Sequence, residues 1–273
     1  MSVDVVVFGA GFTGSAVCAA ALGRGLSVLG VVRSEESAAR LRARGVAATT
    51  TAIDMVARER LGKTTHAIVT FPATATTELA LAPLLAGVRA VSYLSTSGVY
   101  EDTEGIVDDT TPLPAQPSPK YAGVLAAERA FREVGAAVLR APGIYGKGRG
   151  LHVRLARGDF KLSGDGSRYS SRIHVEDLAE LLLASAATPR ETFVVGDLHP
   201  CPQIEMVSWL CEGMGLPLPG SAPLETVHET LRRNRRIDSS RALACLGVAL
   251  RYPTYREGLQ LAVSSWQTRG KTC

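Results

Sequence analysis

Short apolar runs alternate with longer, helix-like segments through residues 3–94. The apolar runs have the length of strands and lie at residues 3–8, 27–32, 66–71 and 89–94, with a fainter fifth at 46–53. The helix-like segments occupy residues 14–23, 34–44 and 76–86. Strands and helices that alternate at this pace are typical of βαβ units, in which the strands run parallel. We therefore expect an α/β protein with a doubly wound parallel sheet.

Residues 101–120 interrupt the alternation with prolines and aspartates, which indicate a long loop. A helix at 121–134, a strand at 136–140, a glycine-rich loop at 142–149, a helix at 173–187 and a strand at 193–195 follow. We interpret residues 1–273 as a single domain, with a small substrate lobe built mainly from about 146–175 and 198–273. In open parallel sheets ligands bind at the carboxyl ends of the strands, so we expect the lobe above that edge.

The sequence Gly-Ala-Gly-Phe-Thr-Gly follows the first strand directly, at residues 9–14. This G-x-G-x-x-G spacing between a strand and a helix is the fingerprint of dinucleotide-binding turns. Gly9 allows the tight turn, Gly11 lets the backbone approach a pyrophosphate, and Gly14 lets the helix pack closely on the strand. The start of the helix adds amide donors and a positive dipole. We therefore expect a Rossmann-type fold that binds NAD or NADP through Gly9, Gly11, Phe12, Thr13 and Gly14.

The end of the second strand bears on the choice between the two dinucleotides. NAD-binding folds carry an acidic residue there, which would repel the 2′-phosphate of NADP. This chain has Arg33 and Ser34 instead, and an arginine pairs well with a phosphate. NADP(H) is favoured and NAD(H) remains possible, because Arg33 can also be a plain solvated strand-end residue.

Composition and charge narrow the class of protein further. Hydrophobic residues make up 46% and charged residues 21% of the chain, as in an ordinary globular protein. The net charge is only +4, and the basic run at 232–236 lacks interleaved aromatic residues, so we expect no nucleic-acid partner. The five cysteines have no metal-ligand spacing, so we expect reduced thiols and no metal site. We see neither a signal sequence nor a membrane-spanning run, and we expect a cytoplasmic protein that acts on a small molecule, without a membrane partner.

Four further segments, at residues 94–100, 139–146, 172–179 and 250–259, complete a pattern that spans the chain. Their sequences are LSTSGVY, LRAPGIYG, RIHVEDLA and LRYPTYREGL. In this order, and with the glycine turn, they resemble the extended short-chain dehydrogenase/reductases, the NAD-dependent epimerase/dehydratase group. The closest likeness is to its atypical members. The resemblance implies an oxidoreductase that uses a nicotinamide cofactor.

The resemblance also implies two catalytic residues and exposes one departure. Thr96 matches the residue that hydrogen-bonds the reacting carbonyl, and Tyr121 lies about where the family has its general acid. The family's lysine follows that tyrosine by four residues, where helix geometry places it on the same face, and this chain has Leu125 there. If Glu128 is aligned with the family's glutamate instead, Lys120 takes the tyrosine position and Val124 the lysine position. Neither alignment gives the Tyr-x-x-x-Lys pair.

The other candidate site residues follow from the matched segments and from the strand ends. The cofactor candidates besides the glycine turn and Arg33–Ser34 are Phe71, Pro72, Ser95, Pro142, Gly143 and Ile144. The substrate candidates are Ser97, Tyr145, Arg149 and Arg172. A lone histidine such as His174 is more often a hydrogen-bonding residue at a helix start than a catalytic group.

Three readings of the broken dyad remain open. In the first, Tyr121 still donates a proton, with another cation or a water in place of the lysine. In the second, the substrate is activated enough to need less help from an acid. In the third, the protein binds the dinucleotide as a sensor without catalysis. We favour a reductase that transfers hydride to a carbonyl or imine carbon of a small molecule. An epimerase or dehydratase acting on a sugar-like substrate is the alternative enzyme. The small residues of the helix that starts near Tyr121 would permit a homodimer.

Overall fold

A central parallel sheet organises the first two-thirds of the structure, which is a computed structural model describing residues 3–72 and 76–270. Its strands are β1 (Val5–Phe8), β2 (Val28–Val31), β3 (Ala47–Thr49), β4 (His66–Val69), β5 (Ala90–Thr96), β7 (Ala137–Ala141) and β12 (Thr192–Val194). They lie in the order β12-β7-β5-β4-β1-β2-β3, and every neighbouring pair is parallel. The strand order reverses at β1, between β2 and β4. The expectation of a Rossmann-type doubly wound sheet is confirmed.

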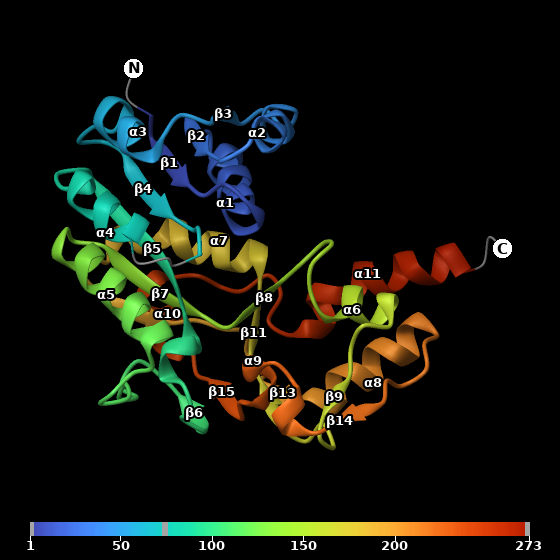
Figure 1. Cartoon of the computed structure of the whole chain (residues 1–273). Helices are drawn as coiled ribbons and strands as arrows, with labels where there is room; N and C mark the ends of the chain where they lie inside the picture. Colours follow the sequence, from blue (N-terminus) through green and yellow to red (C-terminus); the bar gives the residue numbers. More distant parts are fainter. Residues whose placement is uncertain (1–2, 73–75, 271–273) are drawn as a thin grey trace.

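Helices cover both faces of this sheet (Figure 1). One face packs against α1 (Phe12–Gly23), α2 (Glu35–Arg42), α7 (Val175–Ala184) and α10 (Ser240–Leu246), and the other against α3 (Ile53–Arg60), α4 (Thr76–Leu81), η1 (Ala82–Leu85) and α5 (Pro119–Glu133). Successive strand residues point to opposite faces, so Val5 and Val7 of β1 join the first core while Val6 and Phe8 join the second. All four valine and phenylalanine side chains are fully buried. Burial on both faces explains the continuous apolar run that marks this strand in the sequence.

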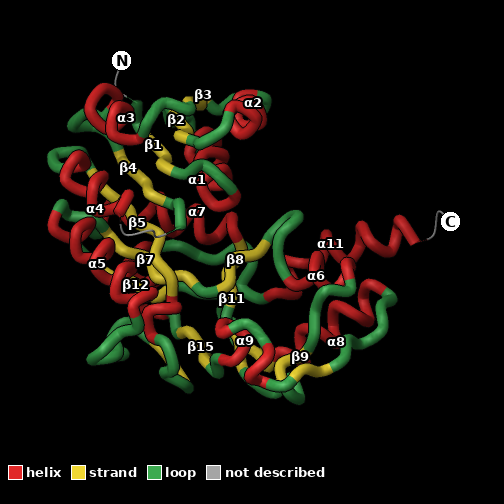
Figure 2. The backbone as a smooth tube through the Cα atoms, viewed as in Figure 1, coloured by secondary structure: helices red, strands yellow, loops and turns green. Residues whose placement is uncertain are grey.

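A smaller lobe extends from the carboxyl edge of the sheet and has its own apolar core (Figure 2). Its elements are α6 (Leu151–Arg157), β9 (Leu162–Ser163), β10 (Tyr169–Ser170), β13 (Cys201–Pro202), α8 (Gln203–Met214), β14 (Ser221–Ala222), η4 (Leu224–Thr226), α9 (Glu229–Arg232) and α11 (Tyr255–Gly270). Short parallel pairs join the two parts: β8 (Gly143–Tyr145) with β11 (Arg172–His174), and β6 (Gly105–Val107) with β15 (Arg235–Ile237). Two 3-10 turns, η2 (Ser97–Tyr100) and η3 (Ser185–Ala187), complete the described elements. Among the described residues, no helix combines the length and apolar character needed to cross a membrane.

Four expectations about local structure were wrong. The helix after the glycine turn begins at Phe12 rather than at residue 14. The expected strand at 46–53 shortens to β3, and the next residues begin the unexpected helix α3. The expected loops at 101–120 and 142–149 contain β6 and β8. Both strands have only three residues and pair with segments far along the chain, so nothing local marks them.

Candidate active site

The glycine turn joins β1 to α1 at the carboxyl edge of the sheet. Gly9 has a φ of 85°, and a Cβ at this position would lie 2.7 Å from the backbone nitrogen of Phe71. A Cβ on Gly14 would lie 2.7 Å from the Gly9 carbonyl oxygen and 2.7 Å from Oγ1 of Thr70, so both positions require glycine. In front of Gly11 the space is open, because a Cβ there would meet only the Gly9 oxygen at 3.9 Å. A phosphate can therefore approach the backbone at the start of α1.

The end of β2 presents the residues expected to contact the ribose of a dinucleotide. Ser34 is the N-cap of α2 and accepts a hydrogen bond from the Ser37 backbone N–H. Arg33 is exposed, and within residues 3–72 and 76–270 it forms no ion pair. The neighbouring carboxylate of Glu35 is paired with Arg42. An unpaired guanidinium is thus available beside the strand end.

Thr96 and Tyr121 come together at the end of β5. The Thr96 hydroxyl oxygen accepts a hydrogen bond of 3.0 Å from the Gly98 N–H, so its own proton stays available for a ligand. The Tyr121 ring packs directly on Gly98, where a Cβ would lie 2.6 Å from ring atom Cε1 and 2.9 Å from the hydroxyl oxygen. Of the two residues that the resemblance assigned to catalysis, Thr96 therefore begins the segment 96–98, and Tyr121 packs against that segment from α5. Their roles stay predictions.

The rotation of α5 is set by a buried ion pair at its other end. The carboxylate of Glu128 accepts hydrogen bonds from Nη2 of Arg140 at 2.7 Å and from the Ser95 hydroxyl at 2.5 Å. Tyr121 precedes Glu128 by seven residues, close to two helical turns, and so faces the same way. Lys120 instead has a side chain that is 58% exposed and pairs with Glu229. The helix thus presents Tyr121 to the site, while Val124 and Leu125 are packed in the core.

The Tyr121 hydroxyl has two charged neighbours that sequence reasoning did not anticipate. Nη2 of Arg233 donates to the phenolic oxygen at 2.6 Å, and the hydroxyl donates to Oε1 of Glu229 at 3.0 Å. The Lys120 ammonium lies 5.0 Å from the centre of the tyrosine ring. Arg233 belongs to the basic run at 232–236, which was the only signal in the sequence. Its separation from Tyr121 by 112 residues hid the contact.

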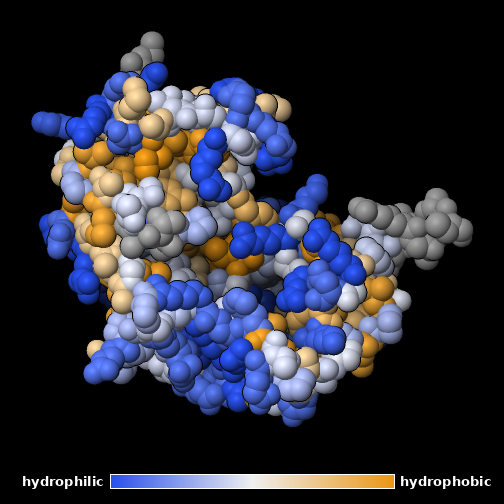
Figure 3. All heavy atoms as spheres, viewed as in Figure 1, coloured by the Kyte–Doolittle hydropathy of each residue, from blue (hydrophilic) through white to orange (hydrophobic). Residues whose placement is uncertain are grey.

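A cavity of about 210 Å³ lies between the sheet edge and the lobe. Gly143, Ile144 and Tyr145 of β8 line one side, and the lobe contributes Phe160, Met206 and Leu231. The space-filling view shows the molecule hollowed between its two parts (Figure 3). The predicted substrate residues Tyr145 and Arg172 and the predicted cofactor residues Gly143 and Ile144 therefore line one cavity.

Three of the four predicted substrate residues have surroundings that do not directly indicate a contact with substrate. Arg172 is buried, and its guanidinium already donates to the Ser170 carbonyl and hydroxyl at 2.8 Å and to Sγ of Cys201 at 3.2 Å. The Ser97 side chain is buried, and its carbonyl accepts from Arg235. Arg149 lies outside the cavity, with its guanidinium carbon 5.0 Å from the centre of the Phe12 ring. This position is next to the glycine turn, on the cofactor side of the site.

His174 is the N-cap of α7, and its Nδ1 accepts from the Glu176 N–H at 3.3 Å. Because Nδ1 is an acceptor, the ring is neutral in this arrangement, and burial lowers the pKa of His174. This geometry agrees with the interpretation of His174 as a residue at a helix start.

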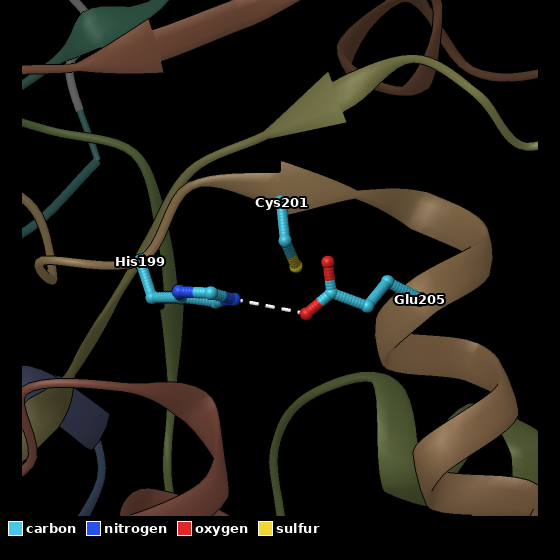
Figure 4. A group of neighbouring side chains, drawn as sticks. All are labelled: His199, Cys201 and Glu205. Carbon is cyan, nitrogen blue, oxygen red and sulfur yellow. Dashed lines mark hydrogen bonds and ion pairs between the residues drawn. The ribbon is translucent and has the colours of Figure 1, made fainter.

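A possible set of metal ligands lies in the lobe, where the sequence spacing indicated none. His199, Cys201 and Glu205 have ligand atoms within 4.8 Å of one another (Figure 4). These atoms already have partners: His199 pairs with Glu205, Arg256 donates to Glu205 at 3.1 Å, and Arg172 donates to Sγ of Cys201. Two guanidinium charges repel a cation, and burial raises the pKa of the Cys201 thiol, which disfavours the thiolate a metal needs. The network fits an ion-pair cluster better than a metal site, and the expected absence of a metal stays a prediction.

Cys18, Cys201, Cys211 and Cys245 are free thiols, and Cys273 lies outside the described residues.

Comparison with known proteins gives the class. Residues 71–196 match the model of the NAD dependent epimerase/dehydratase family. A functionally unknown conserved protein from Silicibacter pomeroyi DSS is 29% identical, with a TM-score of 0.79 and coverage of 98% of this chain and 99% of the other. MoeE5 in complex with UDP-glucose and NAD is 22% identical, with a TM-score of 0.78 and coverage of 98% and 100%. The human epimerase family protein SDR39U1 (isoform 2) with NADPH is 18% identical, with a TM-score of 0.74 and coverage of 95% and 99%. No curated protein matches the sequence.

The parallel sheet and the glycine turn thus define a Rossmann-type α/β protein. The match of residues 71–196 to the NAD dependent epimerase/dehydratase family confirms the resemblance stated from the sequence. Solved relatives of the same fold include one with NAD and one with NADPH.

Proposed function

We propose that this protein is an NADPH-dependent reductase that transfers hydride to a carbonyl or imine carbon of a small-molecule substrate. The observation that carries the proposal is that the Tyr121 ring packs on Gly98, two residues after Thr96, at the carboxyl edge of the sheet. The cavity lined by β8 offers room for a small molecule between the sheet and the lobe, although Thr96 and Tyr121 are not among its lining residues.

The residues of the glycine turn fit a dinucleotide. The space in front of Gly11 is open, and α1 begins without a capping side chain, so its first amides are open to a phosphate. Gly11, Phe12 and Thr13 would hold the pyrophosphate. Arg33 would pair with a 2′-phosphate, which favours NADP(H) over NAD(H). Phe71 and Pro72, at the end of β4, would lie beside the adenosine half.

The chain's own residues then have distinct tasks. A reduced nicotinamide, when bound, supplies the hydride. The Thr96 hydroxyl donates a hydrogen bond to the substrate oxygen or nitrogen, which draws electron density from the carbon that accepts the hydride. Tyr121 donates its proton to the same oxygen or nitrogen as negative charge develops there. Gly143 and Ile144 line the cavity, and the backbone of these two residues and of Pro142 would contact the nicotinamide.

The first experiment is to measure binding of NADP⁺, NADPH, NAD⁺ and NADH by calorimetry. The absorbance at 340 nm is then followed with a panel of carbonyl and imine compounds, using Thr96→Ala as the control variant. We expect tight NADPH binding and NADPH oxidation by the wild-type protein, with turnover lowered about 100-fold in the variant. Failure of all four dinucleotides to bind would overturn the reading of the glycine turn.

The family match supports an epimerase or dehydratase as the second candidate. Such an enzyme oxidises and then reduces its substrate, so its cofactor shows no net consumption. A nucleotide-sugar that is interconverted without net change at 340 nm would favour this candidate. Tight binding without turnover of any substrate would favour a non-catalytic NADP(H) sensor.

A further inference from the structure

Proton donation by Tyr121 creates a charge problem in this site. A tyrosine that has given up its proton carries a negative charge, and the Tyr121 side chain is almost fully buried. A buried anion costs several kcal/mol unless a cation or hydrogen-bond donors compensate it. The residues one turn further along α5 are Val124 and Leu125, which are apolar. The only charged group of the described part of α5 that lies near the ring is Lys120, whose exposed ammonium is paired with Glu229.

Arg233 lies beside the phenolic oxygen. Its Nη2 donates to the phenolic oxygen at 2.6 Å, and its guanidinium carbon lies 5.3 Å from the centre of the ring. A guanidinium has only donors, so the phenolic oxygen is the acceptor in this bond. This is the polarity needed to stabilise an oxygen that is losing its proton. The Arg233 side chain is only 12% exposed, so water screens the interaction weakly.

The segment that carries Arg233 is tied to the site on both sides. Glu229, four residues earlier, lies 3.9 Å from the Arg233 guanidinium and accepts the hydrogen bond from the Tyr121 hydroxyl. Arg235, two residues later, donates to the Ser97 carbonyl at 2.8 Å, next to Thr96. Lys120, the other cation near the ring, pairs with Glu229 instead. The guanidinium is therefore held on the tyrosine oxygen by contacts outside α5.

We infer that Arg233 is a positioning residue for Tyr121 and supplies, from the lobe, the cation on the phenolic oxygen that Leu125 cannot provide. This inference rests on the proposed reductase function. In the step, hydride forms a C–H bond at the substrate carbon while the C=O or C=N π electrons move to oxygen or nitrogen. The Tyr121 proton bonds to that atom, and the phenolate that remains pairs with Arg233 until water reprotonates it. In the structure the Tyr121 hydroxyl donates its hydrogen bond to the carboxylate of Glu229. A substrate atom must replace this carboxylate as the acceptor before the proton is transferred.

The first test does not depend on a known substrate. The absorbance of Tyr121 phenolate at 295 nm is isolated as the difference between each protein and the same protein with Tyr121→Phe. In Arg233→Met we expect a weaker phenolate signal than in the wild type at the same alkaline pH, because no guanidinium then stabilises the anion. Glu229→Gln removes the neighbouring anion, so the signal should move the opposite way. Arg233→Lys should stay near the wild type because it keeps the charge.

Arg236→Met is the matched control, since Arg236 is exposed three residues further along, in β15, and its guanidinium lies over the ring of Tyr169 instead. Melting temperatures of all variants check that the fold is retained. Equal phenolate signals in wild type and Arg233→Met, or an equal weakening in Arg236→Met, would overturn the inference.

The second test uses turnover. We expect Arg233→Met to lower kcat about 100-fold with little change in KM, and Arg233→Lys to recover much of that loss. An unchanged kcat in Arg233→Met would contradict the role. Absence of turnover in the wild type would count against the reductase function alone, because the phenolate measurement stands by itself.

Discussion

Gly98 lies directly beneath the ring of Tyr121, and a Cβ at Gly98 would approach ring atom Cε1 to 2.6 Å. This contact sets the position of the tyrosine ring, so Gly98→Ala should displace the tyrosine. We expect NADPH oxidation to fall at least about tenfold, because general acid catalysis depends on sub-ångström placement. Gly23→Ala is the control, since a Cβ there meets nothing within 4 Å. Full activity in Gly98→Ala would show that Tyr121 need not hold this position.

The ion pair between Glu128 and Arg140 should contribute to stability through the cost of breaking it. Both side chains are at least nine-tenths buried, and Glu128→Ala leaves the Arg140 guanidinium charged without a counter-ion. We expect the free energy of unfolding to fall by about 3 kcal/mol, measured by urea denaturation. Glu133→Ala, at the exposed end of the same helix, should cost far less. Similar losses in the two variants would show that the buried pair has no special role.

Arg33→Glu tests the choice of dinucleotide. The variant removes the unpaired guanidinium and places a carboxylate where NADP carries its 2′-phosphate. We expect the Kd for NADP⁺ to rise about 10- to 100-fold, with a much smaller change for NAD⁺. Arg44→Glu, an exposed charge change beyond the next helix, provides the control for net charge. Equal losses for both dinucleotides would refute the phosphate role of Arg33.

Arg149 was expected to contact the substrate, and its place over Phe12 indicates the cofactor instead. Its guanidinium is close to the helix start where a pyrophosphate would lie. We expect Arg149→Ala to weaken NADPH binding about tenfold in calorimetry, with a salt dependence smaller than that of the wild type. Lys147→Ala in the same loop is the matched control. A raised KM for substrate with an unchanged Kd for NADPH would restore the original expectation.

Asp197 should make stability depend on pH. Burial raises its pKa to about 6, while an unfolded chain has a value near 3.9. The folded state therefore holds this proton more tightly, so stability falls as pH rises from about 4 to 6 and stays lower above that. Asp197→Asn removes the titration. We therefore expect the free energy of unfolding of the variant, relative to that of the wild type, to rise by up to about 2 kcal/mol from pH 4 to pH 7. Urea denaturation at both pH values measures this, with exposed Asp102→Asn as the control. If the difference in the free energy of unfolding between the variant and the wild type does not grow with pH, the pKa of Asp197 is not raised in the folded protein.

Much of the fold was readable because its signals are local. The strand, glycine turn and helix around Gly9–Gly14 specify each other over a few residues, and so do the apolar runs of β4 and β5. The weaker elements were missed for the same reason. The strands β6 and β8 are three residues long and exist only because distant partners complete their hydrogen bonds.

By itself, the sequence determined the parallel sheet, the dinucleotide turn and Thr96 at the end of a strand. It also showed that a lysine is missing after Tyr121. Only the tertiary structure decided which face of α5 meets the site, through the ion pair of Glu128 with Arg140. It also brought Arg233 to the tyrosine oxygen across 112 residues. Periodicity and turn chemistry act over a few neighbouring residues, whereas charge compensation in a buried site depends on whichever side chains the folded chain places in contact.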